Sequence, residues 1–121
     1  MPLAYNTLVL VADGRKALFL RNHGNAQQVD LRVTADRDLQ PRDEETAEEA
    51  EGRFARDLAA EINAMALTSK FDALVVVAPA PTMGELRKHW HTGTAARIVG
   101  EHVKDMTGRR VAEIQAMLLD E

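Results

Sequence analysis

A continuous apolar run at residues 72–78, Asp-Ala-Leu-Val-Val-Val-Ala, constrains the fold more than any other feature of the sequence. After its first residue every side chain in the run is apolar, and the three valines favour an extended backbone. Pro79 then ends the run, because proline cannot donate a hydrogen bond to a neighbouring strand. A strand that is apolar on both faces indicates the centre of a sheet covered by helices on both sides.

Three further strand signals precede this run. Residues 7–12 and 16–21 are apolar stretches joined through Asp13-Gly14, which is typical of a type I′ hairpin turn with positive φ. Residues 28–34 alternate between apolar and polar side chains, as expected for a half-exposed strand. Its apolar side chains are predicted to face inward: Val29, Leu31 and Val33. The first third of the chain is therefore predicted to be a three-stranded antiparallel meander.

A long helix is predicted from Thr46 to about residue 70. Thr46 and Glu49 have the spacing of a capping box. Apolar side chains then recur at helical spacing on one stripe: Ala50, Phe54, Leu58, Ile62 and Met65. The order strand, long helix, strand favours a parallel crossover to residues 72–78. Residues 35–46, before the helix, are charged and broken by Pro41, which predicts a mobile acidic loop.

The last third is less regular. Thr82 and Glu85 match a second capping box, which predicts a helix running to about Trp90. Residues 95–106 fit the period of a helix and of a strand equally well. A third helix is predicted over residues 109–120, with four side chains inward: Val111, Ile114, Met117 and Leu118. Because no repeat or linker interrupts the pattern, residues 1–121 are expected to form one domain.

Composition limits the kinds of function. The chain has 121 residues and no cysteine, which excludes disulfides, thiolate zinc sites and a cysteine nucleophile. Its apolar runs are far shorter than the roughly 20 residues of a membrane span. The N-terminal sequence lacks the pattern of a signal peptide, so a cytoplasmic protein without membrane association is expected. The formal charge of −4 argues mildly against a nucleic-acid partner.

The charge is unevenly distributed along the chain. Residues 36–61 carry ten acidic and four basic side chains, whereas residues 81–110 carry six basic and three acidic ones. The second stretch could form a basic face that attracts phosphates, although a solvated surface of mixed charge explains it too. Thr82 follows the central strand at a helix start, where anions can bind or the side chain can simply cap. The candidate binding residues are Thr82, Arg87, Lys88, His91, Arg97, Lys104, Arg109 and Arg110.

Catalytic signatures are weak. His89 and His91 would point to opposite sides of a helix, and Glu85 with His89 provides only two ligands, so no metal site is predicted. Asp13 follows the first strand, where ribonuclease H-like nucleases place a metal-binding carboxylate, but the central strand ends in Ala78-Pro79 without a second acid. No nucleophile elbow, P-loop or dinucleotide motif occurs. We therefore predict no catalytic residue, metal or cofactor.

Three long stretches of the chain, residues 7–24, 71–91 and 103–118, resemble the bacterial host-attachment protein family. The most specific parts are Gly84-Glu85-Leu86-Arg87 and Lys104-Asp105-Met106-Thr107. The resemblance implies a role in attachment to host cells. Without a signal peptide, that role is expected to be indirect.

That family is in turn similar to the middle domain of eukaryotic- and archaeal-type release factors. Arg53-Phe54-Ala55-Arg56 matches a stretch of their long helix. The resemblance implies a mixed five-stranded α/β (α+β) sheet with three helices, of the ribonuclease H-like type found in translation components, and a fifth strand at residues 98–104. Release factors carry a Gly-Gly-Gln loop before the helix, whereas this chain has Pro41-Arg42-Asp43-Glu44-Glu45-Thr46. Peptidyl-tRNA hydrolysis is therefore not predicted.

The sequence favours a non-catalytic binding or regulatory module that uses its basic stretch to contact RNA, the ribosome or a protein partner. The alternative is a small hydrolase or nuclease using Asp13 with His89 or His91. A homodimer through an edge strand of the meander is a further alternative.

Overall fold

A computed structural model describes residues 1–120 of the chain as a five-stranded sheet with strand order β3-β2-β1-β4-β5. β2 pairs antiparallel with β1 and β3, whereas β1, β4 and β5 are parallel. This arrangement confirms the predicted mixed sheet of ribonuclease H-like type and its N-terminal meander. The strands are β1 (Leu8–Ala12), β2 (Lys16–Asn22), β3 (Leu31–Asp38), β4 (Leu74–Ala78) and β5 (Ile98–Val103). The helices are α1 (Ala47–Leu67), α2 (Ala80–Arg87), α3 (Thr92–Ala95) and α4 (Val111–Asp120).

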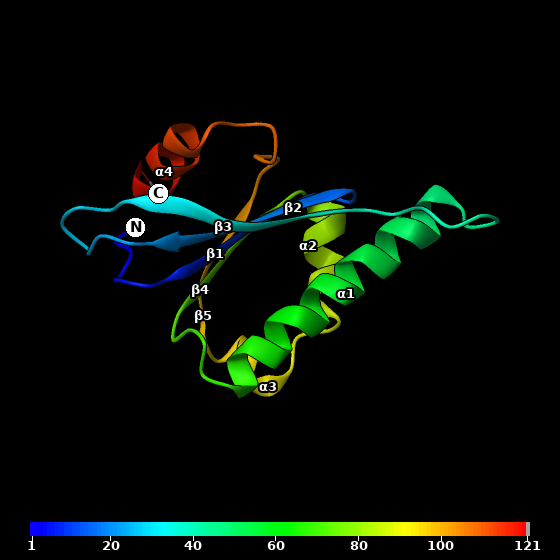
Figure 1. Ribbon diagram of the computed structural model, residues 1–121, viewed down its shortest axis with the longest axis horizontal. Helices are drawn as coiled ribbons and strands as arrows, with labels where there is room; N and C mark the ends of the chain where they lie inside the picture. Colours follow the sequence, from blue (N-terminus) through cyan, green and yellow to red (C-terminus); the bar gives the residue numbers. More distant parts are fainter. Residues whose placement is uncertain (121) are drawn as a thin grey trace.

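The central strands β1 and β4 are buried on both faces, as their composition predicts. Leu8 and Leu10 of β1 pack on the side of α1 and α2, whereas Val9 and Val11 pack on the side of α4. Figure 1 shows α1 and α2 on one side of the sheet and α4 on the other. None of the helices in residues 1–120 is long and apolar enough to cross a membrane.

Helix α1 begins where the sequence predicts. The Thr46 hydroxyl accepts a hydrogen bond from the Glu49 N–H, and the Glu49 carboxylate accepts one from the Thr46 N–H, both at 3.1 Å. The predicted stripe faces the sheet: Ala50, Phe54, Leu58 and Ile62 are buried, and Met65 is partly buried. The helix ends at Leu67, where Thr68 caps it and Ser69 adopts a left-handed conformation with φ 53°.

Gly52 lies in the interior of α1 without a steric need for glycine. A Cβ atom at this position would meet nothing within 4 Å. We expect Gly52→Ala to raise the free energy of unfolding by about 1 kcal/mol, because alanine loses less backbone entropy in a helix. Urea denaturation followed by circular dichroism measures this change. An unchanged or lowered stability would show that Gly52 has a packing role.

Two predictions in the meander are wrong. The third strand runs from Leu31 to Asp38, so residues 35–38 belong to β3 and not to the predicted loop at 35–46. A register shift opposite Phe19 and Leu20 accompanies this extension, and Val33 is exposed, not inward. Because β3 is an edge strand, its charged residues remain in solvent while its backbone pairs with β2.

The turn between β1 and β2 is not of type I′, because no glycine among residues 1–120 has a positive φ. Instead, one Asp13 carboxylate oxygen accepts hydrogen bonds from the N–H groups of Arg15 and Lys16, at 2.8 and 2.7 Å. Glu51 of α1 packs close to Gly14: a Cβ there would lie 2.0 Å from a Glu51 carboxylate oxygen, so that side chain would have to move aside.

The predicted capping box at Thr82 is also wrong. Helix α2 begins at Ala80 with Pro79 as its N-cap, and Thr82 lies inside the first turn. The N–H groups in the first turn of a helix have no partner within the helix, so a proline, which lacks an N–H, loses no hydrogen bond there. The helix therefore starts before Pro81 and not after it. The helix ends at Arg87 instead of Trp90, and the short α3, which the sequence did not predict, brings the helices to four within residues 1–120.

The remaining elements agree with the resemblance. The predicted fifth strand is β5, which resolves the ambiguity of residues 95–106. Helix α4 begins at Val111, two residues later than predicted. Ile114 and Leu118 are buried against the α4 face of the sheet, and Val111 and Met117 are partly buried there.

Candidate functional site

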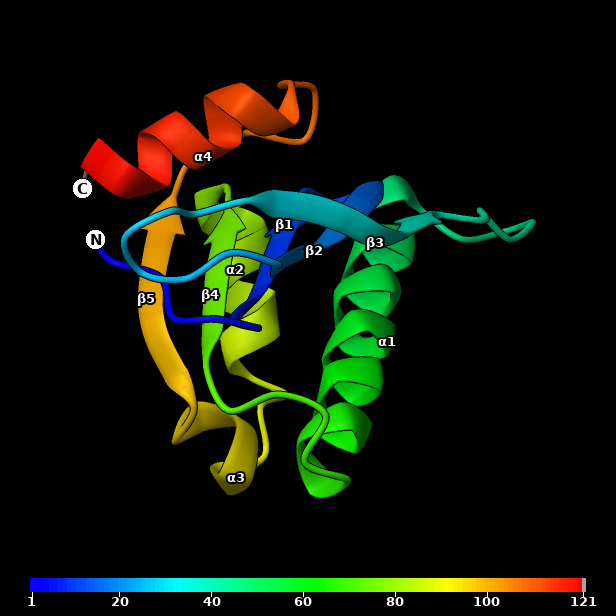
Figure 2. The same cartoon turned by 60° about the vertical axis from the view of Figure 1, so that its left-hand side comes forward.

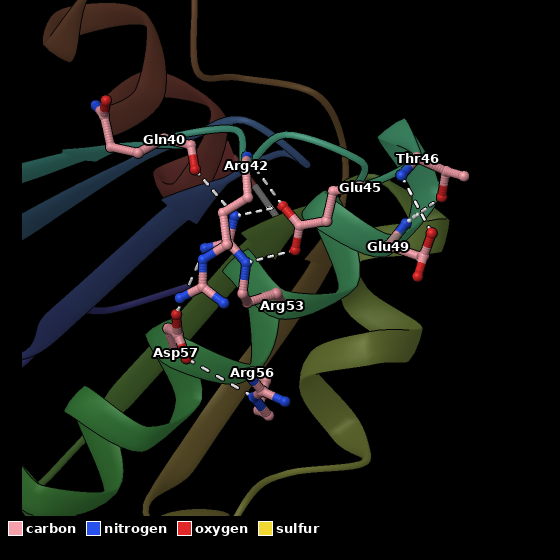
Figure 3. Close-up of polar contacts among 8 residues, drawn as sticks. All are labelled: Gln40, Arg42, Glu45, Thr46, Glu49, Arg53, Arg56 and Asp57. Carbon is pink, nitrogen blue, oxygen red and sulfur yellow. Dashed lines mark hydrogen bonds and ion pairs between the residues drawn. The ribbon is translucent and has the colours of Figure 1, made fainter.

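The segment between β3 and α1, residues 39–46, contains most of the acidic loop predicted from the sequence. In Figures 1 and 2 it projects beyond the sheet at the start of α1. Figure 3 shows that Arg53 of α1 reaches back to this segment. Two of its guanidinium nitrogens donate to the two Glu45 carboxylate oxygens, each at 2.8 Å, and one also donates to the Gln40 carbonyl at 2.9 Å. The first arginine of the Arg-Phe-Ala-Arg stretch therefore fastens the segment to the helix.

The Glu45–Arg53 pair is well shielded, with side-chain exposures of 16% and 12%. The hydrogen bonds from Arg53 lower the pKa of Glu45 to about 2, with a further contribution from the Arg42 N–H. The same contact raises the pKa of Arg53 above its usual value. A two-point contact of this kind fixes direction as well as distance. Whether the rest of the acidic segment is mobile stays a prediction.

This pair predicts a specific dependence of stability on pH. The pKa of Glu45 is lowered from 4.5 in the unfolded chain to about 2 in the folded protein. The ionised Glu45 therefore contributes fully to the free energy of unfolding above pH 4.5, and this contribution disappears as the pH falls to about 2. We expect the unfolding free energies of wild type and Glu45→Gln to differ most above about pH 5 and to converge near pH 2. Urea denaturation at several pH values measures the difference. A difference that is constant with pH would contradict this role.

Apart from Thr82, which lies in the first turn of α2, the predicted binding residues are divided between two places. Arg87 ends α2 and Lys88 follows it, whereas His91 precedes α3 and Arg97 follows it; we call these four residues the α2–α3 basic group. Arg87 donates to Glu101 of β5 at 3.0 Å, and Lys88 donates to Glu85 at 2.7 Å. An Arg97 guanidinium nitrogen donates to the Gly93 carbonyl at 2.8 Å. Arg87 and Lys88 are 54% and 65% exposed, so their ion pairs leave them open to solvent.

The other predicted basic residues lie elsewhere. Arg109 and Arg110 immediately precede α4 and both pair with Glu113, at 3.5 and 3.2 Å. Lys104 follows β5 and is exposed. Figure 2 shows α3 and α4 at opposite ends of β5, so the basic residues do not form one continuous face. Whether either set binds a partner stays a prediction.

Asn63 of α1 was not singled out in the sequence, yet it holds the connection between α2 and α3 in place. It is only 3% exposed. Its amide nitrogen donates to the His89 carbonyl at 2.9 Å. Its carbonyl oxygen accepts from the His91 N–H at 3.1 Å and from the Thr94 hydroxyl at 2.6 Å. An asparagine within an apolar helix stripe is the one sequence signal that could have indicated it.

Asp13 is occupied by structural contacts. Its second carboxylate oxygen accepts a hydrogen bond from the Thr107 hydroxyl at 2.6 Å, and the first is used by the turn. Burial raises the pKa of Asp13, but the hydrogen bonds from Thr107, Arg15 and Lys16 outweigh it and lower the pKa. Within residues 1–120, no three His, Asp or Glu side chains are grouped so that they could hold a metal ion. Nothing in this geometry favours the nuclease alternative.

The chain was also compared with known proteins. The family model described as bacterial archaeo-eukaryotic release factor family 12 matches residues 6–47 and 38–118. The chain belongs to this family. Membership of the release factor family confirms the relation to release factors, whereas a role in host attachment stays a prediction. A comparison with curated protein sequences finds no significant match.

Solved structures of the same fold include the archaeal translation termination factor aRF1, with a TM-score of 0.58 and 9% identity over 94% of this chain. A second archaeal protein aligns with a TM-score of 0.52 and 11% identity over 94% of the chain. The chain spans only 39% and 38% of the lengths of these two proteins. RuvC of Thermus thermophilus aligns with a TM-score of 0.45 and 10% identity, over 78% of this chain and 61% of RuvC. At such low identities the likenesses to the two archaeal proteins show the fold alone.

Proposed function

We propose that the protein is a non-catalytic module that binds the ribosome in the cytoplasm through the α2–α3 basic group. Membership of a release factor family is the observation that carries this proposal. Arg87 and Lys88 lie side by side in sequence on an exposed helix end, where they are accessible to phosphate groups. Their carboxylate partners are exposed as well, and exposed ion pairs are readily exchanged for other contacts.

The segment before α1 supports a role without peptidyl-tRNA hydrolysis. It lacks Gly-Gly-Gln, and Glu45 ties it to Arg53. Three consecutive acidic residues, Asp43, Glu44 and Glu45, would be repelled by the phosphates of ribosomal RNA. The proposal therefore assigns this segment no reaction.

Charge reversal tests the proposal. We expect Arg87→Glu with Lys88→Glu to abolish co-sedimentation with ribosomes at low salt. Removing a basic side chain from a phosphate reduces both the affinity and its salt dependence. The wild-type protein should dissociate progressively from ribosomes as the salt concentration rises. Because exposed ion pairs contribute at most about 1 kcal/mol, the variant is expected to remain folded, which circular dichroism checks.

Two charge-matched controls sharpen this test. Arg32→Glu with Lys70→Glu changes two exposed bases outside the predicted set, and should bind as the wild type does. Arg109→Glu with Arg110→Glu asks whether the residues before α4 contribute separately. A wild type that does not sediment with ribosomes at low salt would refute the proposal. Capture from lysate that survives nuclease treatment would indicate a protein partner instead.

A further inference from the structure

A pocket of about 380 Å³ lies between the first turns of α1 and α2. Glu48, Glu51 and Gly52 line it from α1, and Pro81, Thr82 and Glu85 line it from α2. Three carboxylates thus surround one small space and disfavour an anion there. The pocket touches the proposed ribosome contact at one residue only, since Glu85 pairs with Lys88.

The carboxylates are only partly compensated by the chain itself. Glu85 accepts a hydrogen bond from the Lys88 ammonium at 2.7 Å, and this contact lowers the pKa of Glu85. Glu51 is 3.9 Å from the Arg15 guanidinium, which is a loose pair. Glu48 makes no ion pair within residues 1–120. The pocket therefore keeps negative charge that a cation could neutralise, and Lys88 shows that an ammonium group fits against its rim.

Thr82 gives the second and independent indication of a ligand. Thr82 lines the pocket, and only 7% of its surface is exposed. Within the described residues its hydroxyl has no hydrogen-bond partner. Trp90 Nε1 is the one fully enclosed side-chain polar atom without a partner in residues 1–120, so the Thr82 hydroxyl is not fully enclosed. Because Thr82 lines the pocket and its hydroxyl is not fully enclosed, the hydroxyl can accept a hydrogen bond from a ligand there.

The position of the pocket in the sheet agrees with a binding role. Glu51 approaches Gly14, which follows the carboxyl end of β1, and Pro81 follows the carboxyl end of β4. After β1 the chain continues to β2 on one side of this strand pair, and after β4 it continues to β5 on the other side. Crevices at such a switch point are preferred ligand sites in sheets with parallel strands.

We infer that this pocket binds an alkylammonium group, either a lysine side chain of a partner or a free polyamine. The ammonium donates to the carboxylates of Glu48 and Glu51 and to the Thr82 hydroxyl, and Glu85 stays paired with Lys88. The methylene groups of such a cation lie against Pro81 and Gly52, which form the uncharged part of the lining.

The test is a titration followed by the NMR signals of the Gly52 amide and the Thr82 methyl group. The probes are spermidine and a tetrapeptide with alternating lysine and glycine, each compared with sodium chloride at equal ionic strength. We expect saturable shifts at Gly52 and Thr82 with at least one probe. Stronger binding of spermidine would assign the site to a polyamine, and stronger binding of the peptide to a partner's lysine.

Three variants connect the shifts to the pocket. Glu48→Gln with Glu51→Gln should weaken binding about tenfold, because two charged acceptors are removed. Thr82→Val keeps the shape and should weaken binding about fivefold without lowering stability, with recovery in Thr82→Ser. Gly52→Leu should block the pocket, since a Cβ at this position meets nothing within 4 Å and the side chain has room. Asp43→Asn with Glu44→Gln removes the same charge outside the pocket, and should bind as the wild type does.

Three outcomes would overturn the inference. The first is that neither probe shifts the two signals beyond the effect of sodium chloride. The second is a control variant that weakens binding as much as Glu48→Gln with Glu51→Gln, which would show a diffuse attraction of cations to an acidic surface. The third is an equal saturable shift with magnesium chloride at equal ionic strength, which would assign the pocket to a divalent cation. A ribosome-binding defect of Arg87→Glu alone bears only on the proposed function, because Arg87 pairs with Glu101 and not with a carboxylate of the pocket.

Discussion

Replacing Asn63 by leucine is expected to lower the free energy of unfolding by about 3 kcal/mol. Leucine has a similar volume but leaves three polar groups without their partner: the His89 carbonyl, the His91 N–H and the Thr94 hydroxyl. The Thr94 side chain is completely buried, so water cannot replace the missing acceptor without rearrangement. Urea denaturation measures the loss of stability.

A local measurement separates this effect from general destabilisation. Amide exchange at His91 should become faster in Asn63→Leu than exchange at the central strand residue Val76, because the Asn63 carbonyl fixes the α2–α3 connection. Thr94→Val is the matched control, since it removes one hydrogen bond of the three and should cost about 1 kcal/mol. Wild-type stability of Asn63→Leu would show that the connection is held by packing alone.

Replacing Asn22 by leucine is expected to cost about 4 kcal/mol, the largest effect of any substitution considered. Asn22 ends β2 and is 1% exposed. Its amide nitrogen donates to the carbonyls of Leu3 and Ala4, at 2.9 and 3.2 Å. Its carbonyl oxygen accepts from the N–H groups of Gly24 and Asp30, both at 2.9 Å. One side chain thus joins the N-terminal segment to the loop between β2 and β3.

The control for Asn22 lies in the same loop. The Asn25 side chain accepts hydrogen bonds from the N–H groups of Gln27 and Gln28, but it is exposed. Water can replace its contacts, so Asn25→Ala should cost about 1 kcal/mol or less. Urea denaturation of both variants measures the two effects. Equal effects of Asn22→Leu and Asn25→Ala would contradict the assignment of Asn22 as the junction.

Sequence patterns were most informative where burial and periodicity coincide. The run at 72–78 predicted the central strand, and Thr46 with Glu49 predicted the start of α1, because each is a local signal. The end of β3 was missed because Asp36 and Asp38 lie on an exposed edge, where backbone pairing leaves no apolar pattern.

The polar contacts that position the candidate site had no such local signal. Asn63 bonds with residues 26 to 31 positions away, so its role depends on where α3 packs. The α2–α3 basic group was predicted together with Arg109 and Arg110, because charge along the sequence does not show which elements share a face. Arg53 was noticed only because its stretch of sequence resembles one in release factors. Its contact with Glu45 became evident only in the structure.

The parallel pairing of β1 with β4 has a consequence for how the chain folds. Leu8 pairs with Leu74, and the whole meander and α1 lie between them in sequence. The antiparallel pairs β1–β2 and β2–β3 close short loops, whereas β1–β4 pairing must close a long one at a greater entropic cost. We therefore expect the meander to form before β4 adds, and in that interval the apolar strand β1 has an unpaired edge to which another chain can add. On this view we expect the docking of α1 and β4 to limit the folding rate and to end the exposure of this edge.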